Sequence, residues 1–342
     1  TRDLSVPGGV VPAAHVTKVG VTATHRRRGL LSRLMRRQLT DVGEPVAVLW
    51  ASQPGIYGRY GYAPAVWQAG LSVDLPRLGA APSLPDTGRL RELTPASAID
   101  VLAPLLREYQ SVRAGVSGRV RLRWESHLDD PSDQRDGATA RRIVIHYGPN
   151  GEADGYALWR GKPQWDRGPA GVVLVEEVVS LNPTAYAALW RHLLSMDMAT
   201  TVQYRHATVD EPLRQLVGDP RALGMYVRDA VWLRITDVPR ALEARRYTAD
   251  VDVVIEVADD VLPANNGRYR LVADGDSARC VRTTDPADLS MSVAELATVY
   301  LGGVALAELV AAGTVTAHRP EAVPAASAGF GWPLAPSGIE VF

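Results

Sequence analysis

Several residue types that build functional sites are scarce in this sequence. Its 342 residues include one cysteine, Cys280, which excludes an internal disulfide framework and any zinc site that needs several cysteines. The seven histidines are scattered and show no HExxH or comparable spacing, so we expect no metal ion. A GxSxG nucleophile elbow is also missing. The usual sequence signs of a metal site and of a serine hydrolase are therefore absent.

Net charge and long apolar runs are lacking as well. The formal net charge of −1 provides no global field that would draw the chain to nucleic acid or to an anionic membrane. No uninterrupted apolar run approaches the roughly 20 residues that a membrane helix needs. A chain with one cysteine suits a reducing compartment. We therefore expect a cytoplasmic globular protein of two or three domains, with neither nucleic acid nor membrane as partner.

The most unusual stretch that is present is THRRRGLL, residues 24–31, where three arginines precede Gly29. Val16–Val21 reads as a strand before it. After it, apolar residues recur at helical spacing, namely Leu30, Leu31, Leu34, Met35, Leu39 and Val42. The N-terminus of a helix carries unpaired N–H groups and binds phosphate. Gly29 leaves the backbone open to a bulky anion, and arginines donate paired hydrogen bonds to phosphate oxygens.

Two other interpretations of the arginines stay open. A merely solvated basic helix start is disfavoured, because cations oppose the helix dipole at this end. Nucleic-acid binding is disfavoured, because the cluster is short and no aromatic platform is interleaved with it. We interpret His25 as a surface residue and the turn as a pyrophosphate site.

These residues carry a resemblance to a known family. RRRGLL, residues 26–31, resembles the Arg/Gln-x-x-Gly-x-Gly/Ala signature of GNAT acetyltransferases, with Leu31 where glycine or alanine is usual. VGVTATHRRRGLLSRLM together with LWASQPGIYGRYGYAPA is similar to the Eis (enhanced intracellular survival) family of N-acetyltransferases. GRYRLVADGDSARC and LSMSVAELATVYLGG resemble the strands and helix of the sterol-carrier fold. The resemblance covers nearly the whole chain.

The resemblance implies an α+β fold, with tandem GNAT-like mixed-sheet domains followed by a sterol-carrier-protein-like α+β domain. We assign residues 1–84 to the C-terminal part of the acetyl-CoA-binding GNAT domain. Residues 85–236 form the second GNAT-like domain, which lacks a cofactor of its own, and residues 237–342 form the sterol-carrier-like domain with the catalytic C-terminus. A linker rich in proline and glycine is expected over residues 76–88. The early elements of the first GNAT domain are expected before Thr1.

The resemblance also assigns site residues. Acetyl-CoA lies against the backbone of Val19, Gly20 and Val21, and Ser52 and Gln53 line its pantetheine side. Its pyrophosphate is held by the turn and the helix start, namely Arg26, Arg27, Arg28, Gly29, Leu30, Leu31 and Ser32. Tyr57 matches the general acid of the family, and the carboxylate of Phe342 matches the general base.

The assigned roles suit acetyl transfer from a thioester to an amine. A tyrosine with a pKa near ~10 can protonate a thiolate whose conjugate acid has a pKa near ~8.5. A terminal carboxylate, with a pKa of about 3.3–3.7, is a poor base unless burial raises that value or a water relays the proton. Spacing alone cannot separate Tyr57 from Tyr60 and Tyr62. The tail is apolar, with Trp332, Ile339, Val341 and Phe342, and we expect it to dock on the protein. It either places the catalytic carboxylate of Phe342 or is merely packed on a domain.

We predict an acetyl-CoA-dependent N-acetyltransferase of primary amines, with aminoglycosides, polyamine-like compounds and lysine side chains as candidates. Relatives that acetylate aminoglycosides often have an acidic residue just before the last one. In this sequence Val341 occupies that position, and Glu340 lies one position earlier.

We interpret Glu176 and Glu177 as a structural pair on a strand. The partners are then a small-molecule amine and further copies of the chain, as a hexamer; the alternative is a binding protein for an apolar ligand with a vestigial GNAT core.

Overall fold

The computed structural model describes residues 1–86 and 88–342, except for the side chain of Ala96, so Thr87 in the predicted linker lies outside the described residues. These residues form two compact units. Unit 1 consists of Thr1–Trp67, Ser111–Ser117 and Asp229–Phe342. Unit 2 consists of Gln68–Gln110 and Gly118–Arg228.

The first sheet of unit 1 has five strands in the order β1-β2-β3-β12-β4. Strands β1 and β2 form an antiparallel hairpin, β2 and β3 are parallel, and β12 is antiparallel to both β3 and β4. The bounds are Arg2–Val6 (β1), Gly9–His15 (β2), Val46–Trp50 (β3), Ala63–Pro64 (β4) and Val231–Ile235 (β12). Helix α1, Leu30–Asp41, makes the crossover from β2 to β3, and the short helix α2, Pro54–Tyr57, follows β3.

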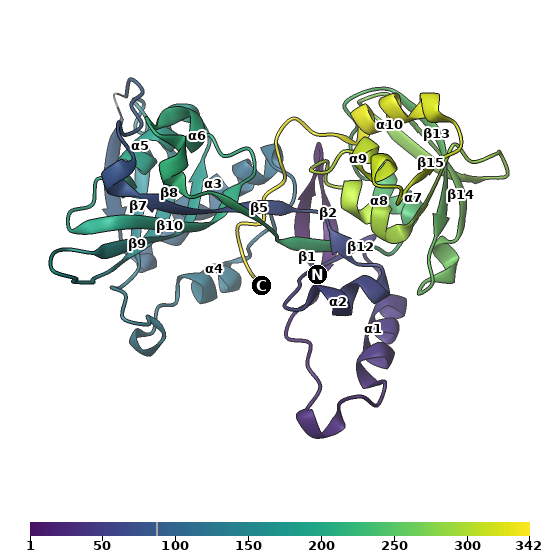
Figure 1. The fold of residues 1–342 in the computed structure, drawn as a ribbon, viewed down its shortest axis with the longest axis horizontal. Helices are drawn as coiled ribbons and strands as arrows, with labels where there is room; N and C mark the ends of the chain where they lie inside the picture. Colours follow the sequence, from purple (N-terminus) through teal and green to yellow (C-terminus); the bar gives the residue numbers. More distant parts are fainter. Residues whose placement is uncertain (87) are drawn as a thin grey trace. The chain divides into compact units, whose positions relative to one another are not determined.

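The second sheet of unit 1 is built from the C-terminal third of the chain, in the order β15-β14-β13-β16-β17. Its strands are β13 (Val251–Ala258), β14 (Gly267–Ala273), β15 (Ala278–Thr283), β16 (Leu289–Ser292) and β17 (Thr316–Ala317). Helices α8, α9 and α10 lie together on one side of this sheet (Figure 1). The helices are α7 (Val238–Glu243), α8 (Val293–Val299), α9 (Leu306–Ala311) and α10 (Val323–Phe330).

One hydrophobic core serves both sheets of unit 1. Leu233 of β12, Ile255 of β13 and Leu296 of α8 are all fully buried in the same cluster. A buried ion pair crosses it, because the Arg234 guanidinium contacts the Asp259 carboxylate at 2.6 Å. Cys280 lies in this core, and burial raises the pKa of its thiol to about 12, as a structural cysteine requires.

Unit 2 contains a seven-stranded sheet in the order β11-β5-β10-β9-β8-β7-β6. Its central strands β9 and β10 are parallel and are joined by helix α5, while β5 is antiparallel to β10 and β8 to β9. The strands are β5 (Trp67–Asp74), β6 (Arg89–Leu93), β7 (Arg142–Tyr147), β8 (Ala153–Lys162), β9 (Gly171–Ser180), β10 (Ala199–Thr208) and β11 (Tyr226–Asp229). The helices are α3 (Pro95–Val112), α4 (Arg121–Leu128), α5 (Pro183–Leu194) and α6 (Leu213–Leu216).

Helix α5 illustrates how the sequence builds unit 2. The Asn182 side chain caps it by accepting the Ala185 N–H at 2.8 Å, and Pro183 occupies the first helical position. Its apolar face, with Leu189, Trp190 and Leu193, is fully buried on the sheet. A parallel strand pair with a helical crossover needs that kind of cover.

The α+β fold class is confirmed, whereas two local expectations were wrong. Val16–Val21 is not a strand: β2 ends at His15, and Lys18 has a φ of +54°, which a strand does not accommodate. Leu34, expected on the apolar face of α1, is 49% exposed. Within the described part of the chain no helix is both long and apolar enough to cross a membrane.

Candidate active site

A cavity of about 640 Å³ in unit 1 is lined by residues from two stretches. One includes the turn at residues 24–29, called the arginine turn below, and the other is the segment that follows β3. Two stretches some thirty residues apart in sequence therefore share one site. The cavity is lined by Val19, Gly20, Val21, His25, Arg26, Arg27, Gly29, Leu30, Leu31, Ser32, Ser52, Gln53, Ile56, Tyr57, Arg59 and Tyr60. Of the residues that the resemblance assigned, Arg28 and Phe342 are not part of this lining.

The turn before α1 has the features of an anion cradle. Gly29 caps the helix at a φ of +73°, and a Cβ built on it would meet no atom within 4 Å. Arg27 also has a positive φ, +59°, which is uncommon for a side chain of its kind. Successive N–H groups in such a turn converge on one side and bind anions.

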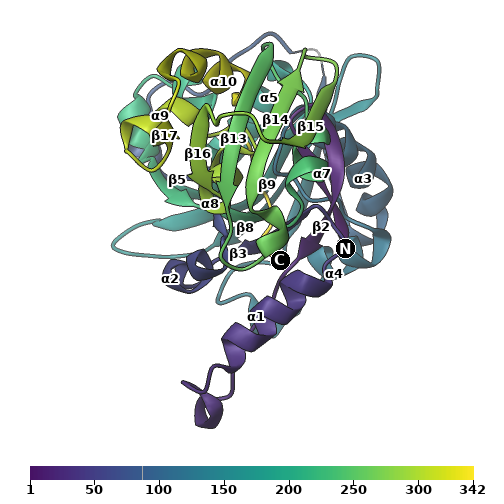
Figure 2. The same cartoon turned by 90° about the vertical axis from the view of Figure 1, so that its right-hand side faces the viewer.

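The arginine side chains are available to a ligand. Arg26, Arg27 and Arg28 are exposed, and within residues 1–86 and 88–342 none of them contacts a carboxylate. The nearby Arg37, by contrast, pairs with Asp41 on α1 at 2.5 Å. The turn lies at the free end of α1 in both views (Figure 1 and Figure 2). Exposed cations at an open helix N-terminus fit the pyrophosphate of a nucleotide-like co-substrate.

The three tyrosines that spacing could not separate lie in different surroundings. Tyr57, on α2, lines the cavity and packs edge to face on Tyr62, with ring centroids 6.2 Å apart. Tyr60 also lines it, and its hydroxyl forms a 3.0 Å hydrogen bond with the Ser32 hydroxyl. Tyr62 does not line the cavity, and burial raises the pKa of its phenol far above the ordinary value. Tyr62 is therefore unsuited to give up a proton in this site.

The C-terminal tail is irregular and docked in unit 1. The Ser337 N–H donates to the Ala114 carbonyl at 2.8 Å, and the Arg113 guanidinium donates to the Ala335 carbonyl at 2.6 Å. Ile339 is 4% exposed, whereas Val341 is exposed to solvent. An apolar tail with no helix or strand is thus held by its backbone and by the buried side chains of Ser337, Ile339 and Glu340.

Phe342 packs against the end of β2. Its ring centroid lies 4.5 Å from that of His15, and the Arg2 guanidinium lies 5.7 Å from the centre of the Phe342 ring. The His15 imidazole is held by the Ala13 carbonyl at Nδ1 and by the Ser117 hydroxyl at Nε2. Burial, reinforced by the Arg2 charge, lowers the pKa of His15 to about 4. His15 is therefore neutral near pH 7, donating at Nδ1 and accepting at Nε2.

Glu340 is committed to an ion pair. Its carboxylate lies 3.3 Å from the Arg2 guanidinium, and only 4% of its side chain is exposed. A carboxylate whose charge is offset by a neighbouring arginine is a weaker attractor for a cationic ligand than a free one. The exposed residue beside Phe342 is Val341, which is uncharged.

The two glutamates of β9 are structural, as we interpreted them from the sequence. Glu177 is fully buried and pairs with Arg119 at 2.5 Å, with His127 and Tyr156 as further partners. Burial alone would raise the pKa of Glu177, but Arg119 and His127 hold it well below the ordinary value. Glu176 is bound by Arg141 and Arg160.

Comparisons with known proteins agree with this architecture. Residues 1–65 and 115–235 match two families described as acetyltransferase (GNAT) domains, and residues 238–337 match the sterol carrier protein domain family. An uncharacterized N-acetyltransferase of Streptomyces avermitilis is 44% identical over 97% of this chain and 83% of its own length. The N-acetyltransferase Eis of Mycobacterium bovis is 33% identical over 90% of this chain and 76% of its own length. The chain belongs to the Eis family of N-acetyltransferases.

A solved structure extends the likeness to three dimensions. The crystal structure of Eis1 from Mycobacterium abscessus covers all of this chain and 85% of its own, with a TM-score of 0.85 at 37% identity. This Eis-family protein is thus an N-acetyltransferase, and its GNAT fold implies acetyl-CoA as the co-substrate. The arginine turn and the open Gly29 fit that group.

Some residues around the site of this Eis-family acetyltransferase were not expected from the sequence. Ile56 and Arg59 line the cavity, and their position in the stretch IYGRYGY beside Tyr57 was the available signal. His15 and Arg2, which contact Phe342, had none, because each lies more than 320 residues from it in sequence.

Proposed function

We propose that this acetyltransferase moves the acetyl group of acetyl-CoA to a primary amine of a small molecule, with Tyr57 as general acid. The observation that carries the proposal is the cavity that joins the unpaired arginine turn to Tyr57. The arginines supply charge for the pyrophosphate of acetyl-CoA, and the Tyr57 phenol supplies an acid for its thioester. Aminoglycosides, polyamine-like compounds and lysine side chains are the candidate amines.

Binding is assigned to the turn and its neighbours. Arg26, Arg27 and Arg28 provide the cations for the pyrophosphate, and the open backbone at Gly29 and the start of α1 provides N–H donors. Ser52 and Gln53 are assigned to the pantetheine side. The irregular backbone of Val19–Val21 is assigned to the thioester, where its N–H groups would stabilise the oxyanion.

The reaction needs two proton transfers. The amine attacks the thioester carbonyl, so that a C–N bond forms and the C–S bond breaks. The Phe342 carboxylate is the proposed acceptor of the amine proton, directly or through a water. Tyr57 is the proposed donor to the departing thiolate, because its phenol lines the cavity and a phenol can protonate a thiolate.

The ion pair of Glu340 with Arg2 bears on the substrate. Because that pair offsets the charge of Glu340 and Val341 carries none, the tail adds little attraction for a polycation. We therefore propose that compact primary amines are turned over better than aminoglycosides with many charges. The domain boundaries at residues 84 and 236, the hexamer and the cytoplasmic location remain part of the same proposal.

The test uses the full-length protein with acetyl-CoA and a panel of primary amines: a polyamine, an aminoglycoside and a lysine-containing peptide. Release of coenzyme A is followed with a thiol reagent, and the product is identified by the added mass of one acetyl group. Amine-dependent release of thiol is expected. If no amine in the panel is acetylated while acetyl-CoA still binds by calorimetry, the proposed substrate class is wrong.

A lipid carrier with a vestigial GNAT core is the second candidate, and nothing in the site favours it. The arginine turn has no internal carboxylate partner among the described residues, and Tyr57 faces an open cavity. We would not expect a site that has lost its activity to keep an exposed arginine turn and a tyrosine at an open cavity.

A further inference from the structure

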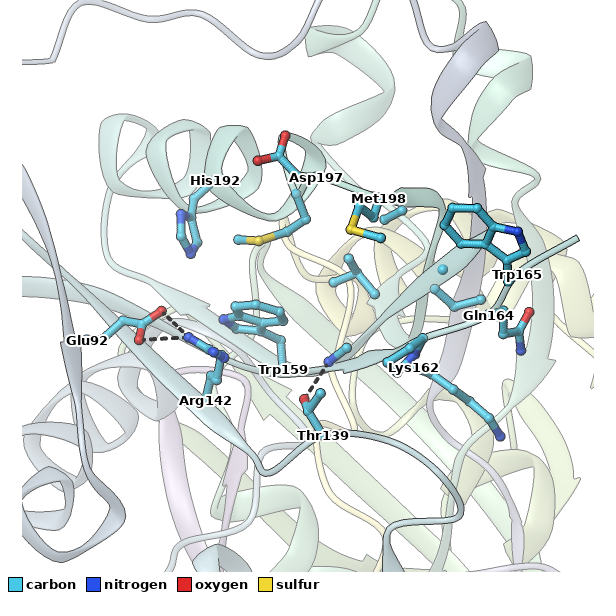
Figure 3. Close-up of a pocket in the computed structure, with 17 residues that line it drawn as sticks. Glu92, Thr139, Arg142, Trp159, Lys162, Gln164, Trp165, His192, Asp197 and Met198 are labelled. Carbon is cyan, nitrogen blue, oxygen red and sulfur yellow. Dashed lines mark hydrogen bonds and ion pairs between the residues drawn. The ribbon is translucent and has the colours of Figure 1, made fainter. Parts of the chain in front are cut away.

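Unit 2 contains a second cavity, of about 690 Å³, that shares no residue with the candidate active site (Figure 3). It lies where the two parallel strands begin, because Gly171 is the first residue of β9 and Ala199 the first of β10. His192, near the end of α5, completes one wall. Ligand pockets in proteins have about 300–1,000 Å³, so this cavity has room for a small molecule.

Most of the lining is apolar and adaptable. Figure 3 shows the indoles of Trp159 and Trp165 at opposite ends of the cavity, with the thioether of Met198 between them. Met196 and Val173 complete the apolar wall. Indole rings and thioethers provide large, polarisable contact surfaces for an aromatic or alkyl group.

The rim exposes apolar side chains that a free surface would not favour. Trp165 is 69% exposed and Met198 is 64% exposed. Met198 also has a φ of +62°, although a long side chain disfavours that conformation. The Gly171 N–H donates to the Met198 carbonyl at 3.0 Å, and a Cβ on Gly171 would lie only 2.7 Å from that oxygen. Gly171 thus allows the backbone contact that presents Met198 at the rim.

The other end of the cavity holds two polar nitrogens without partners. The Nε1 atom of Trp159 and the Nε2 atom of His192 are buried, and neither has a hydrogen-bond partner among the described residues. Trp159 is only 6% exposed, and its ring meets the His192 ring edge to face at a centroid distance of 6.0 Å. A buried polar group without a partner is costly, and a bound molecule that reaches it removes that cost.

The charges at the cavity are balanced. The Arg142 guanidinium lies 3.2 Å from the Glu92 carboxylate, and Lys162 pairs with Asp136 at 3.0 Å. The carboxylate of Asp197 is directed away from the cavity in Figure 3. Burial lowers the pKa of His192, so its imidazole is neutral near pH 7. Among the described residues that line the cavity, each cation is paired with a carboxylate, so no free cation is left for an anionic ligand.

We propose that this cavity binds an uncharged small molecule, whose aromatic or alkyl body lies against Trp165 and Met198 and whose hydroxyl or carbonyl end faces Trp159 and His192. The polar end accepts the Trp159 N–H and exchanges a hydrogen bond with His192 Nε2. Arg142 lies over the Trp159 ring at 5.5 Å and its side chain is 52% exposed, so it can turn aside as the ligand enters. The proposal does not depend on the acetyl-transfer site.

The test measures binding of 2-naphthol, an uncharged bicyclic alcohol, to the full chain by titration calorimetry and ligand-observed NMR. Saturable binding at one site per chain is expected, with binding of the anion 2-naphthoate at least about tenfold weaker, which corresponds to about 1.4 kcal/mol. Trp165→Ala and Met198→Gly remove exposed rim side chains, and glycine adopts the positive φ of position 198 readily. Each is expected to weaken 2-naphthol binding several-fold without lowering Tm.

Val227→Ala is the matched control, because Val227 is 56% exposed in unit 2 and does not line the cavity. It should bind 2-naphthol as the parent protein does. Absence of saturable binding overturns the proposal, as does binding that neither rim variant changes or that 2-naphthoate equals. If 2-naphthol does not bind and Trp165→Ala lowers the oligomer mass in light scattering, the face is a contact between copies and the proposal is wrong.

Discussion

Tyr57, Tyr60 and Tyr62 lie within six residues of one another, and their surroundings give them different chemistry. Tyr57 and Tyr60 line the candidate active site, and Tyr60 is tied to Ser32 through its hydroxyl. Tyr62 is 1% exposed, and its hydroxyl has no partner among the described residues. The sequence motif favours Tyr57 as the general acid. The different environments of Tyr60 and Tyr62 depend on packing in the folded protein, which cannot be read from the sequence.

The first prediction concerns the general acid. Tyr57→Phe removes the proposed proton donor and keeps the ring, so kcat should fall by about 10²–10⁴-fold with little change in the KM for acetyl-CoA. Tyr60→Phe is the matched control: it loses one hydrogen bond, which stabilises by about 1 kcal/mol, and should keep most of its turnover. Steady-state kinetics with a competent amine measures both. A larger loss in Tyr60→Phe would move the role to Tyr60.

His15 gives a prediction about pH. Its pKa is about 4 in the folded protein, against an ordinary value of 6.5, so between these values the unfolded chain binds more protons. The stability that the neutral imidazole contributes is present above pH 6.5 and is lost as the pH falls toward 4. The contribution is on the order of 2–3 kcal/mol. Urea unfolding at pH 7.5 and 4.5 should therefore show a smaller pH dependence in His15→Gln, and an equal dependence would contradict the assignment.

At the scale of elements, the turn and helix α1 show both what the sequence predicts and where it fails. Helical spacing of apolar residues correctly predicted a helix that begins after Gly29, because periodicity and a glycine at the cap are local signals. The strand expected over Val16–Val21 was wrong, since the positive φ of Lys18 arises from the path of the chain and not from its own preference. The contacts of Phe342 with His15 and Arg2 could likewise not be predicted from local sequence pattern.

The positive φ of Arg27 allows binding and folding to be separated. Arg27→Gly relieves the left-handed conformation at +59°, so Tm should stay level or rise. The same change removes one cation from the cavity, so the KM for acetyl-CoA should rise by about 3–10-fold, and less so at high salt. Arg33→Ala is the control, because Arg33 is exposed on α1 and does not line the cavity. An equal rise in both variants would mean that general basic charge, and not the turn, attracts the co-substrate.

At the scale of the whole molecule, the chain passes from the first sheet of unit 1 into the sheet of unit 2 and then back again. After β4 it leaves unit 1, and β5 pairs with β10 in the sheet of unit 2. After β11 it returns, and β12 inserts between β3 and β4. Which sheet each strand joins could not be predicted from the sequence, because local pattern carries no information about distant pairing.

The buried pair of Arg234 and Asp259 links β12 to the segment after β13, and its loss should be severe. Asp259→Ala leaves a guanidinium buried without its charge partner and should destabilise unit 1 by about 3–5 kcal/mol. The double variant Arg234→Met/Asp259→Leu removes both charges and should recover much of that loss. Denaturant unfolding followed by near-UV circular dichroism measures both. A double variant no more stable than Asp259→Ala would show that the hydrogen bonds of Asp259 to backbone, and not its charge, dominate.

The insertion of β12 has a consequence for synthesis on the ribosome. Strand β3 ends at Trp50, but its partner on one side begins at Val231, roughly 180 residues later. At about 5–20 residues per second, the nascent chain carries an unpaired edge of β3 for roughly 10–40 seconds. An apolar edge exposed for so long is a target for chaperones, and a message cut between these strands would yield a fragment that aggregates and does not fold.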